Sequence, residues 1–275
     1  MILLSTGSLH TYGLNRAFEL AAQVGYDGVE VIIDQRADTW QIDYLKRLSD
    51  ENALPIRSLH SPFLLAVPGW PHADGDRILR TVKLAEAIRA DTVVAHLPTR
   101  WRYNLLTTQR RHIPLPAFPM RNRRPLTWFE QELPFIQAET PVAIAIEIMP
   151  MHRFLGWPVN AHVWNNLDEW PRFENLTLDT THCGTWKVDP LKAYDRADGR
   201  VRNVHLSNYD RRQQHLLPHQ GRLHLDKFLR HLAADGYQGP ITVEVRPDAM
   251  ETDDEARVRE NLAASLAFCR EHFCP

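Results

Sequence analysis

Residues 14–33 read LNRAFELAAQVGYDGVEVII, and the fold prediction starts from this stretch. Its first eleven residues place apolar side chains at helical spacing, and Gly25 follows as a residue typical of a helix C-terminus. Residues 28–33 form a nearly continuous apolar run, which is expected of a parallel strand covered on both faces. The same order of glycine, turn and Glu-bearing strand returns at 236–244 (GYQGPITVE). Both stretches predict one helix–turn–strand unit, used twice.

Apolar runs of this kind recur along the whole chain, with amphipathic stretches between them. We expect strands at Ile2–Thr6, Gly28–Ile33, Pro55–His60, Thr92–Leu97, Val142–Ile148, Leu176–Thr180, Val201–Leu206 and Ile241–Val245. We expect helices at Leu14–Val24, Ile42–Asn52, Arg77–Ala90, Trp128–Glu139, His162–Trp170, Pro190–Ala197, Leu225–Ala234 and Glu255–His272. Eight alternations predict an α/β fold, a closed (β/α)8 barrel of parallel strands, as a single domain over residues 1–275.

The longest interruption of this pattern is a loop at about residues 99–125, after the fourth strand. It carries four prolines and seven arginines, and prolines at this density oppose regular structure. A loop after a barrel strand lies at the C-terminal face, where barrel enzymes hold their sites. Two interpretations stay open: a solvated excursion, or a lid that offers Arg side chains with Trp101 and Tyr103 to an anionic substrate.

Composition excludes several classes of protein. The chain has 275 residues, with 32 Lys and Arg against 34 Asp and Glu, and a net charge of −2. This balance disfavours nucleic acid as a partner. No apolar run is long enough to span a membrane, and the N-terminus lacks the features of a secretory signal. Three cysteines without CxxC spacing disfavour a disulfide framework, so we expect a cytoplasmic protein. A homodimer is compatible with all of this.

Six of the predicted strands end in, or next to, residue types that bind metals. In a closed barrel these ends converge on one axis. Three of the residues are carboxylates, and buried carboxylates need a compensating positive charge. A divalent cation is the simplest source of that charge, and neutral imidazoles complete its coordination. The residues are His60, His96, Glu147, Asp179, His205 and Glu244, followed by His182 shortly after the sixth strand.

Taken in order, the motifs resemble the xylose isomerase-like TIM barrels, which include sugar-phosphate isomerases and epimerases and the endonuclease IV type of DNA-repair enzyme. The motifs are GYDGVE, LHSP, DTVVAH, AIEIMP, LDTTH, VHLSNYD and YQGPITVEV. The resemblance covers essentially the whole chain. For the isomerases it implies one divalent ion, such as Mn, Mg, Co or Zn, held by Glu147, Asp179, His205 and Glu244. It further implies that His182 and Arg211 contact substrate.

The endonuclease-like branch implies additional ligands, and here His60, His96, His182 and His215 match them. They form a candidate second metal site. The Asp of the branch's Asp-x-His pair is replaced by Gln213, which puts a third site in doubt. The epimerase pattern has its own departure, because no second carboxylate follows Glu147 closely. Arg153 stands in that region and favours a phosphate or carboxylate group on the substrate.

Two enzymatic functions follow, and we weigh them in this order. The first is a metal-dependent isomerase or epimerase of a sugar or sugar phosphate, with Glu147 and Glu244 as acid and base around an enediolate, assisted by His182. The second is a phosphoester hydrolase with two or more clustered ions, acting on a small phosphoester. A lyase or dehydratase on the same ion, and a noncatalytic metal-binding regulator, stay as further alternatives.

Three more residues are candidates because of where they stand. His10 follows the first strand at the barrel mouth, and Trp186 follows the sixth. We expect His10, Arg153, Trp186 and Arg211 to contact a small-molecule substrate. Glu30, inside the second strand, is more readily explained by pairing within the barrel than by substrate binding.

Overall fold

Eight parallel strands close into a barrel, as the alternating pattern predicts. The computed structural model describes residues 1–63, 67–107, 112–121, 123–154 and 157–273, with the backbone alone for 101–124 and 153–154. The spatial order of the strands is β1 (Ile2–Ser5), β12 (Ile241–Val243), β11 (Val201–Leu206), β10 (Leu176–Asp179), β7 (Ala143–Glu147), β4 (Thr92–His96), β3 (Ile56–His60) and β2 (Gly28–Ile32), which returns to β1. The fold is a TIM barrel.

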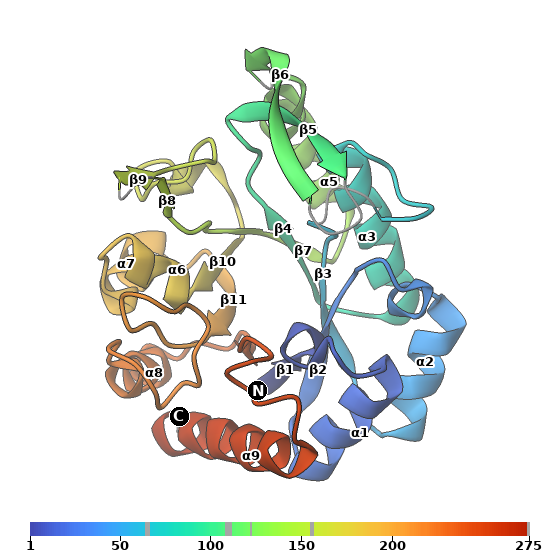
Figure 1. Cartoon of the computed structure of the whole chain (residues 1–275), viewed down its shortest axis with the longest axis vertical. Helices are drawn as coiled ribbons and strands as arrows, with labels where there is room; N and C mark the ends of the chain where they lie inside the picture. Colours follow the sequence, from blue (N-terminus) through green and yellow to red (C-terminus); the bar gives the residue numbers. More distant parts are fainter. Residues whose placement is uncertain (64–66, 108–111, 122, 155–156, 274–275) are drawn as a thin grey trace.

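The helices surround this barrel, and α9 runs along the lower edge in the view of Figure 1. Those of at least seven residues are α1 (Leu14–Val24), α2 (Ile42–Glu51), α3 (Asp74–Ile88), α5 (Leu133–Glu139), α7 (Pro190–Ala197), α8 (Leu225–Ala234) and α9 (Glu255–His272). Shorter ones are η1 (Thr6–Leu9), η2 (Ala37–Thr39), α4 (Arg123–Thr127), the π-helical η3 (Trp128–Glu132), η4 (Trp170–Arg172) and α6 (Thr180–Thr185). Among the described residues, no helix is long and apolar enough to cross a membrane.

The unit that opened the sequence analysis forms as predicted. Gly25 ends α1 with φ +96°, a left-handed conformation that side-chain-bearing residues rarely adopt, and its N–H bonds back into the last turn. Val29 and Val31 of β2 are fully buried, in keeping with a strand covered on both faces. The barrel closes where β1 pairs with β12, with Ile2 opposite Ile241 and Leu4 opposite Val243.

The prediction that residues 99–125 lack regular structure is wrong. Strands β5 (Trp101–Thr107) and β6 (His112–Arg121) pair as an antiparallel hairpin, which projects from the barrel at the top of Figure 1. A two-stranded sheet has two open edges, where the missing N–H of a proline costs no ladder bond. Pro114 and Pro116 are two residues apart, so the backbone nitrogens of both can lie on the same edge of β6. The side chains of the proposed lid lie outside the described residues.

The predicted helix at His162–Trp170 is also wrong, and the segment is a series of turns that ends in η4. Asn166 Oδ1 accepts bonds from the backbone N–H groups of Asp168 and Glu169, and Asn165 bonds the backbone of Met149 on both sides. Short polar side chains of this kind compete with the helical hydrogen bonds. The sequence analysis also missed α6, which starts directly after β10, and the hairpin of β8 (His152–Phe154) and β9 (Trp157–Val159).

Candidate metal centre

The ligand-type residues meet at one end of the barrel because each stands where a parallel strand finishes. His60, His96, Glu147 and Asp179 are the last residues of β3, β4, β7 and β10. Glu244 directly follows β12. The strand register makes His96 the direct partner of Glu147, and Asp179 the direct partner of His205 in β11.

Three overlapping groups result, and in each one a ligand atom of every member lies within 4.8 Å of those of the others. The central group is Glu147, Asp179, His205 and Glu244. The first flank is His60, His96 and Glu147. The second flank is Asp179, His182 and His215.

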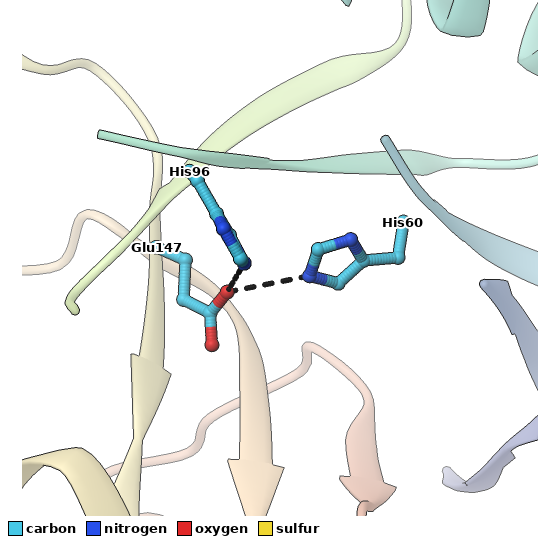
Figure 2. Close-up of side chains that lie close together, drawn as sticks. All are labelled: His60, His96 and Glu147. Atoms are coloured by element: carbon cyan, nitrogen blue, oxygen red, sulfur yellow. Dashed lines mark hydrogen bonds and ion pairs between the residues drawn. The ribbon is translucent and has the colours of Figure 1, made fainter. Parts of the chain in front are cut away.

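Glu147 belongs to two groups, and its two oxygens face different neighbours. Oε2 lies 2.9 Å from His96 Nε2 and 3.3 Å from His60 Nε2, and Figure 2 shows both imidazoles turned toward this one oxygen. Oε1 lies 3.2 Å from His205 Nδ1 and 3.5 Å from His182 Nδ1. A carboxylate placed in this way has the geometry of a bridge between two cation positions.

The central group converges on one nitrogen. His205 Nδ1 lies 2.9 Å from Glu244 Oε2, 3.2 Å from Glu147 Oε1 and 4.0 Å from Asp179 Oδ2. Apart from these histidine contacts, two of the oxygens, Asp179 Oδ2 and Glu244 Oε2, are buried and have no hydrogen-bond partner among the described residues. Leaving a carboxylate oxygen in this condition is costly.

Three of the histidines have one ring nitrogen bonded to a neutral group of the protein. His60 Nδ1 donates to the carbonyl of Ser61 at 2.8 Å, and His182 Nδ1 donates to that of Ile148 at 2.6 Å. His215 Nδ1 shares a 3.2 Å bond with the Ser207 hydroxyl. The carbonyl partners fix the tautomers of neutral His60 and His182, so that Nε2 of each keeps its lone pair for a ligand.

The pKa values of the ligand residues are shifted by burial and by the charges of the neighbouring ligand residues. Burial acts to raise the pKa of Glu147, but the surrounding histidines, His205 first, hold this pKa well below its usual value. Burial raises the pKa of Asp179, with His182 as the largest opposing influence. Burial acts to lower the pKa of His205, yet Glu30, Glu244 and Glu147 raise it well above normal.

The donor set fits divalent cations. Three carboxylates and one imidazole in the central group suit Mn, Mg, Co or Zn, and two imidazoles with a carboxylate in the first flank suit the softer members of that series. Within the described part of the chain, the ion pairs of Glu147, Asp179 and Glu244 are all with histidines. A cation would therefore supply charge compensation that these contacts do not.

Of the residues predicted to contact substrate, Trp186, Arg211 and His10 belong to none of the three ligand groups. Trp186 is half-buried, and its Nε1 donates to the Met149 carbonyl at 2.9 Å. Arg211 is exposed and has φ +81°, and His10 is exposed at the end of η1. The Arg153 side chain lies outside the described residues. Among the described residues, the side chains of Trp186, Arg211 and His10 form no hydrogen bond or ion pair with the metal-type ligands, although the Trp186 backbone N–H donates to the His182 carbonyl at 3.3 Å.

The structure also brings forward one residue that the sequence analysis missed. Phe63 is 48% exposed, and its ring stacks on that of His96 at 5.2 Å and meets that of His60 edge-on at 5.3 Å. The signal was its position directly after the LHSP motif. Phe63 gives the first flank an apolar face open to solvent.

Comparison with known proteins decides the family. A family model described as xylose isomerase-like TIM barrel matches residues 18–271. The chain belongs to this family. Family membership agrees with the closed eight-stranded barrel and with the resemblance carried by the sequence motifs.

Relatives of the xylose isomerase-like chain differ in what their names state. An uncharacterized protein of Mycobacterium tuberculosis is 28% identical, covering 98% of this chain and 96% of its own, and one of Mycobacterium leprae has the same values. Among solved structures, the 3-keto-D-glucoside 4-epimerase of E. coli has a TM-score of 0.68 at 19% identity, covering 98% of this chain and 99% of its own.

Two further solved structures cover most of both chains. A D-tagatose 3-epimerase-like protein has a TM-score of 0.65 at 17% identity, with 99% of each chain covered. A family 2 AP endonuclease of Brucella melitensis has a TM-score of 0.64 at 15% identity, covering 90% of this chain and 93% of its own. At these identities the likeness shows the fold alone, which these epimerases and this endonuclease share.

Proposed function

We propose that the protein is a divalent-metal-dependent isomerase or epimerase of a sugar or sugar-like small molecule. The observation that carries the proposal is a pair of carboxylates on separate strands around one ligand group. Glu147 ends β7 and Glu244 follows β12, with β10 and β11 between them in the barrel. Both lie within 3.2 Å of His205 Nδ1.

A divalent ion in the central group would polarise adjacent carbonyl and hydroxyl oxygens of a sugar and acidify the C–H bond between them. The chain supplies the acid and the base. Glu244 is the more exposed of the pair, with 18% of its side chain accessible against 3% for Glu147. We assign Glu244 to remove the proton from carbon, and Glu147, on the other side, to return one to the opposite face or to the neighbouring carbon.

Other residues of the site have supporting roles. His182 is held by the Ile148 carbonyl at 2.6 Å and lies beside Glu147 and Asp179, where its Nε2 can orient a substrate oxygen. Phe63 and Trp186 offer apolar faces for a sugar ring, and Arg211 and His10 stand on exposed loops where a larger substrate would extend. These assignments remain proposals for mutagenesis.

The test is hydrogen exchange at carbon. Protein loaded with Mn²⁺ or Zn²⁺ is incubated in D₂O with a panel of ketoses and ketose phosphates, and deuterium at the carbon next to the carbonyl is followed by NMR. We expect metal-dependent incorporation for at least one member of the panel. At a metal concentration that saturates the variant, with bound metal measured on the same sample, Glu244→Gln should abolish incorporation. Exchange that persists in metal-loaded Glu244→Gln would refute the assignment.

A second function, hydrolysis of a small phosphoester by two clustered ions, is favoured by one specific observation. Glu147 Oε2 is shared by His60 and His96, so the first flank offers a second cation position next to the central group. Two ions bridged in this way suit activation of water and stabilisation of a leaving oxygen. The net charge of −2 favours a small phosphoester over DNA.

The variant His96→Asn separates the two functions. It removes a first-flank ligand and leaves all four members of the central group unchanged. If the protein is an isomerase, His96→Asn should keep most of the carbon-exchange activity. If it is a hydrolase, wild type should cleave bis(4-nitrophenyl) phosphate or a monoester with two bound ions, and His96→Asn should lose that activity together with one ion.

A further inference from the structure

A second layer of polar side chains lies directly beneath the central group, inside the barrel. Its members come from four strands, and every one has an exposed fraction of 0%. They are Glu30 of β2, Ser58 of β3, Asn203 of β11 and Thr242 of β12. Burying a carboxylate at this depth costs free energy unless the carboxylate is hydrogen-bonded and paired with a positive charge.

The layer holds Glu30 in one orientation. The Ser58 hydroxyl donates to Glu30 Oε2 at 2.7 Å, and Asn203 Nδ2 donates to the same oxygen at 2.9 Å. Thr242 Oγ1 in turn donates to Asn203 Oδ1 at 2.9 Å, which fixes the direction of the Asn203 amide. Both neutral donors are thus spent on Oε2, which leaves Oε1 with His205 as its close polar neighbour among the described residues.

The charge of Glu30 is directed at His205. Its Oε1 lies 3.1 Å from His205 Nε2, and its Oε2 lies 3.3 Å from the same nitrogen. The opposite nitrogen, Nδ1, faces Glu147 and Glu244 of the central group. The imidazole therefore spans two layers, with a carboxylate behind it and the candidate ligands in front.

This arrangement differs from that of the other histidines. His60 and His182 are backed by neutral peptide carbonyls, and His215 is backed by a hydroxyl. A carboxylate behind an imidazole keeps the proton on the near nitrogen more firmly and increases the electron density at the far one. Of these four histidines, His205 alone belongs to the central group.

We infer that Glu30 is a positioning residue for the metal centre: it holds His205 with Nε2 protonated and Nδ1 presented as the ligand, and it strengthens that ligand. This inference rests on the metal site of the proposed function. It assigns the glutamate of the GYDGVE stretch a role in ion binding through His205, without contact with the substrate.

The experiment compares wild type, Glu30→Gln and Ser58→Ala. Glu30→Gln keeps the shape and removes the charge behind His205. Ser58→Ala is the matched control, because it removes a 2.7 Å bond to the same carboxylate and leaves the contact with His205. The affinities for Mn²⁺ and Zn²⁺ are measured by competition with a chelator, and the ring N–H signals of ¹⁵N-histidine-labelled protein are recorded without metal and with Zn²⁺.

We expect Glu30→Gln to lower the affinity for both Mn²⁺ and Zn²⁺ by about 10-fold or more, the range seen when the outer partner of a metal-bound histidine is removed. The His205 Nε2–H proton should move upfield in Glu30→Gln with and without metal. Ser58→Ala should keep the affinity and the proton shift of wild type. In zinc-loaded wild type, Nε2 should carry the proton and Nδ1 the metal.

Two results would overturn the inference. One is an affinity and an N–H shift in Glu30→Gln that equal those of wild type; the other is zinc bound through Nε2 in wild type, which can be seen even if Glu30→Gln does not fold. Failure of the proposed function looks different, because wild type would then bind neither ion, and the ligand-positioning role of Glu30 would fall with it. If wild type binds neither ion, a shift of the His205 Nε2–H signal in metal-free Glu30→Gln would show that the Glu30–His205 pair has only a structural role.

Discussion

The two flanks of the metal centre are built on different parts of the fold. In the first flank, each ligand ends a barrel strand, and His96 and Glu147 are direct partners in the β4–β7 ladder. In the second flank, Asp179 ends a strand, but His182 lies in the short helix α6, and His215 stands in a loop with φ +52°. Sheet register alone brings the first flank together, whereas the second depends on a loop.

The loop is held by local bonds. His215 N donates to Thr181 Oγ1 at 3.2 Å, and its ring bonds Ser207. The one acidic residue that would complete the second flank is absent, because Gln213 stands there and accepts from Arg246. We therefore expect the central group and the first flank to bind ions more tightly than the second flank.

The largest effect is expected from Glu147→Gln, which breaks the bridge. It weakens both the central group and the first flank, so ion affinity should fall by more than about 100-fold, since loss of an outer-shell partner alone costs 10- to 100-fold. Elemental analysis of the purified protein and chelator competition measure this. Glu139→Gln, on the exposed end of α5, is the matched control. Wild-type metal content in Glu147→Gln would exclude a bridging role.

The next effect compares the flanks directly. His96→Asn should weaken ion binding by about 100-fold and His215→Asn by only about 10-fold, the two ends of the range for perturbed metal sites. The reason is that His96 is placed by the sheet, whereas the second flank lacks its carboxylate. Isothermal titration of both variants with Zn²⁺ gives the affinities. The opposite order would show that the loop, not the sheet, holds the tighter ion.

A pH effect should appear beside the first flank. Burial, with a smaller contribution from His96, lowers the pKa of His162 to about 3. His162 takes up a proton near pH 6.5 in the unfolded chain, but only at about pH 3 in the folded chain. The contribution of His162 to the free energy of unfolding is therefore fully present above pH 6.5 and is lost as the pH falls toward 3. Between pH 7 and pH 5 this loss amounts to about 2 kcal/mol.

His162→Gln should remove that loss. Urea unfolding of the metal-free protein at both pH values measures the difference, with His10→Gln as the control because His10 is exposed. Equal acid sensitivity in His162→Gln and wild type would mean that His162 is protonated in the folded state.

The smallest expected effect is a gain in ion affinity at the second flank. Gln213→Asp supplies the second flank with the carboxylate that its sequence lacks, and we expect about 10-fold tighter binding of the weakest ion. Gln214→Asp, one residue further on, adds the same charge without the same placement. If both variants behave alike, the gain comes from general charge and the second flank is not a metal site.

The fold was predictable because its signals are local and repeated. Helices α1, α7, α8 and α9 have the predicted bounds, and the eight barrel strands begin and end within two residues of prediction. The errors fall where side chains override the pattern. Asn166 bonds the backbone and prevents a helix, and the edges of a hairpin accommodate prolines that read as breakers.

Within the candidate site, the residues at strand ends could be found from the strand pattern, whereas His182 in a short helix and His215 in a loop were found through the family resemblance. His60, His96 and Glu147 follow from register once the barrel closes. Arg211 was chosen through the family resemblance and His10 by its position after a strand; both are exposed, and their contact with substrate stays a prediction. The role of Phe63 depends on a turn after β3 that no periodicity encodes.

The pairing of β1 with β12 has a consequence for synthesis. Residues Ile2–Leu4 leave the ribosome long before Ile241–Val243, so this edge of β1 stays uncovered until β12 has been made. Glu244, the last member of the central group, emerges with that final strand. An ion that needs all four ligands can be captured only at the moment of closure, so metal uptake would report the completion of the barrel on a nascent chain.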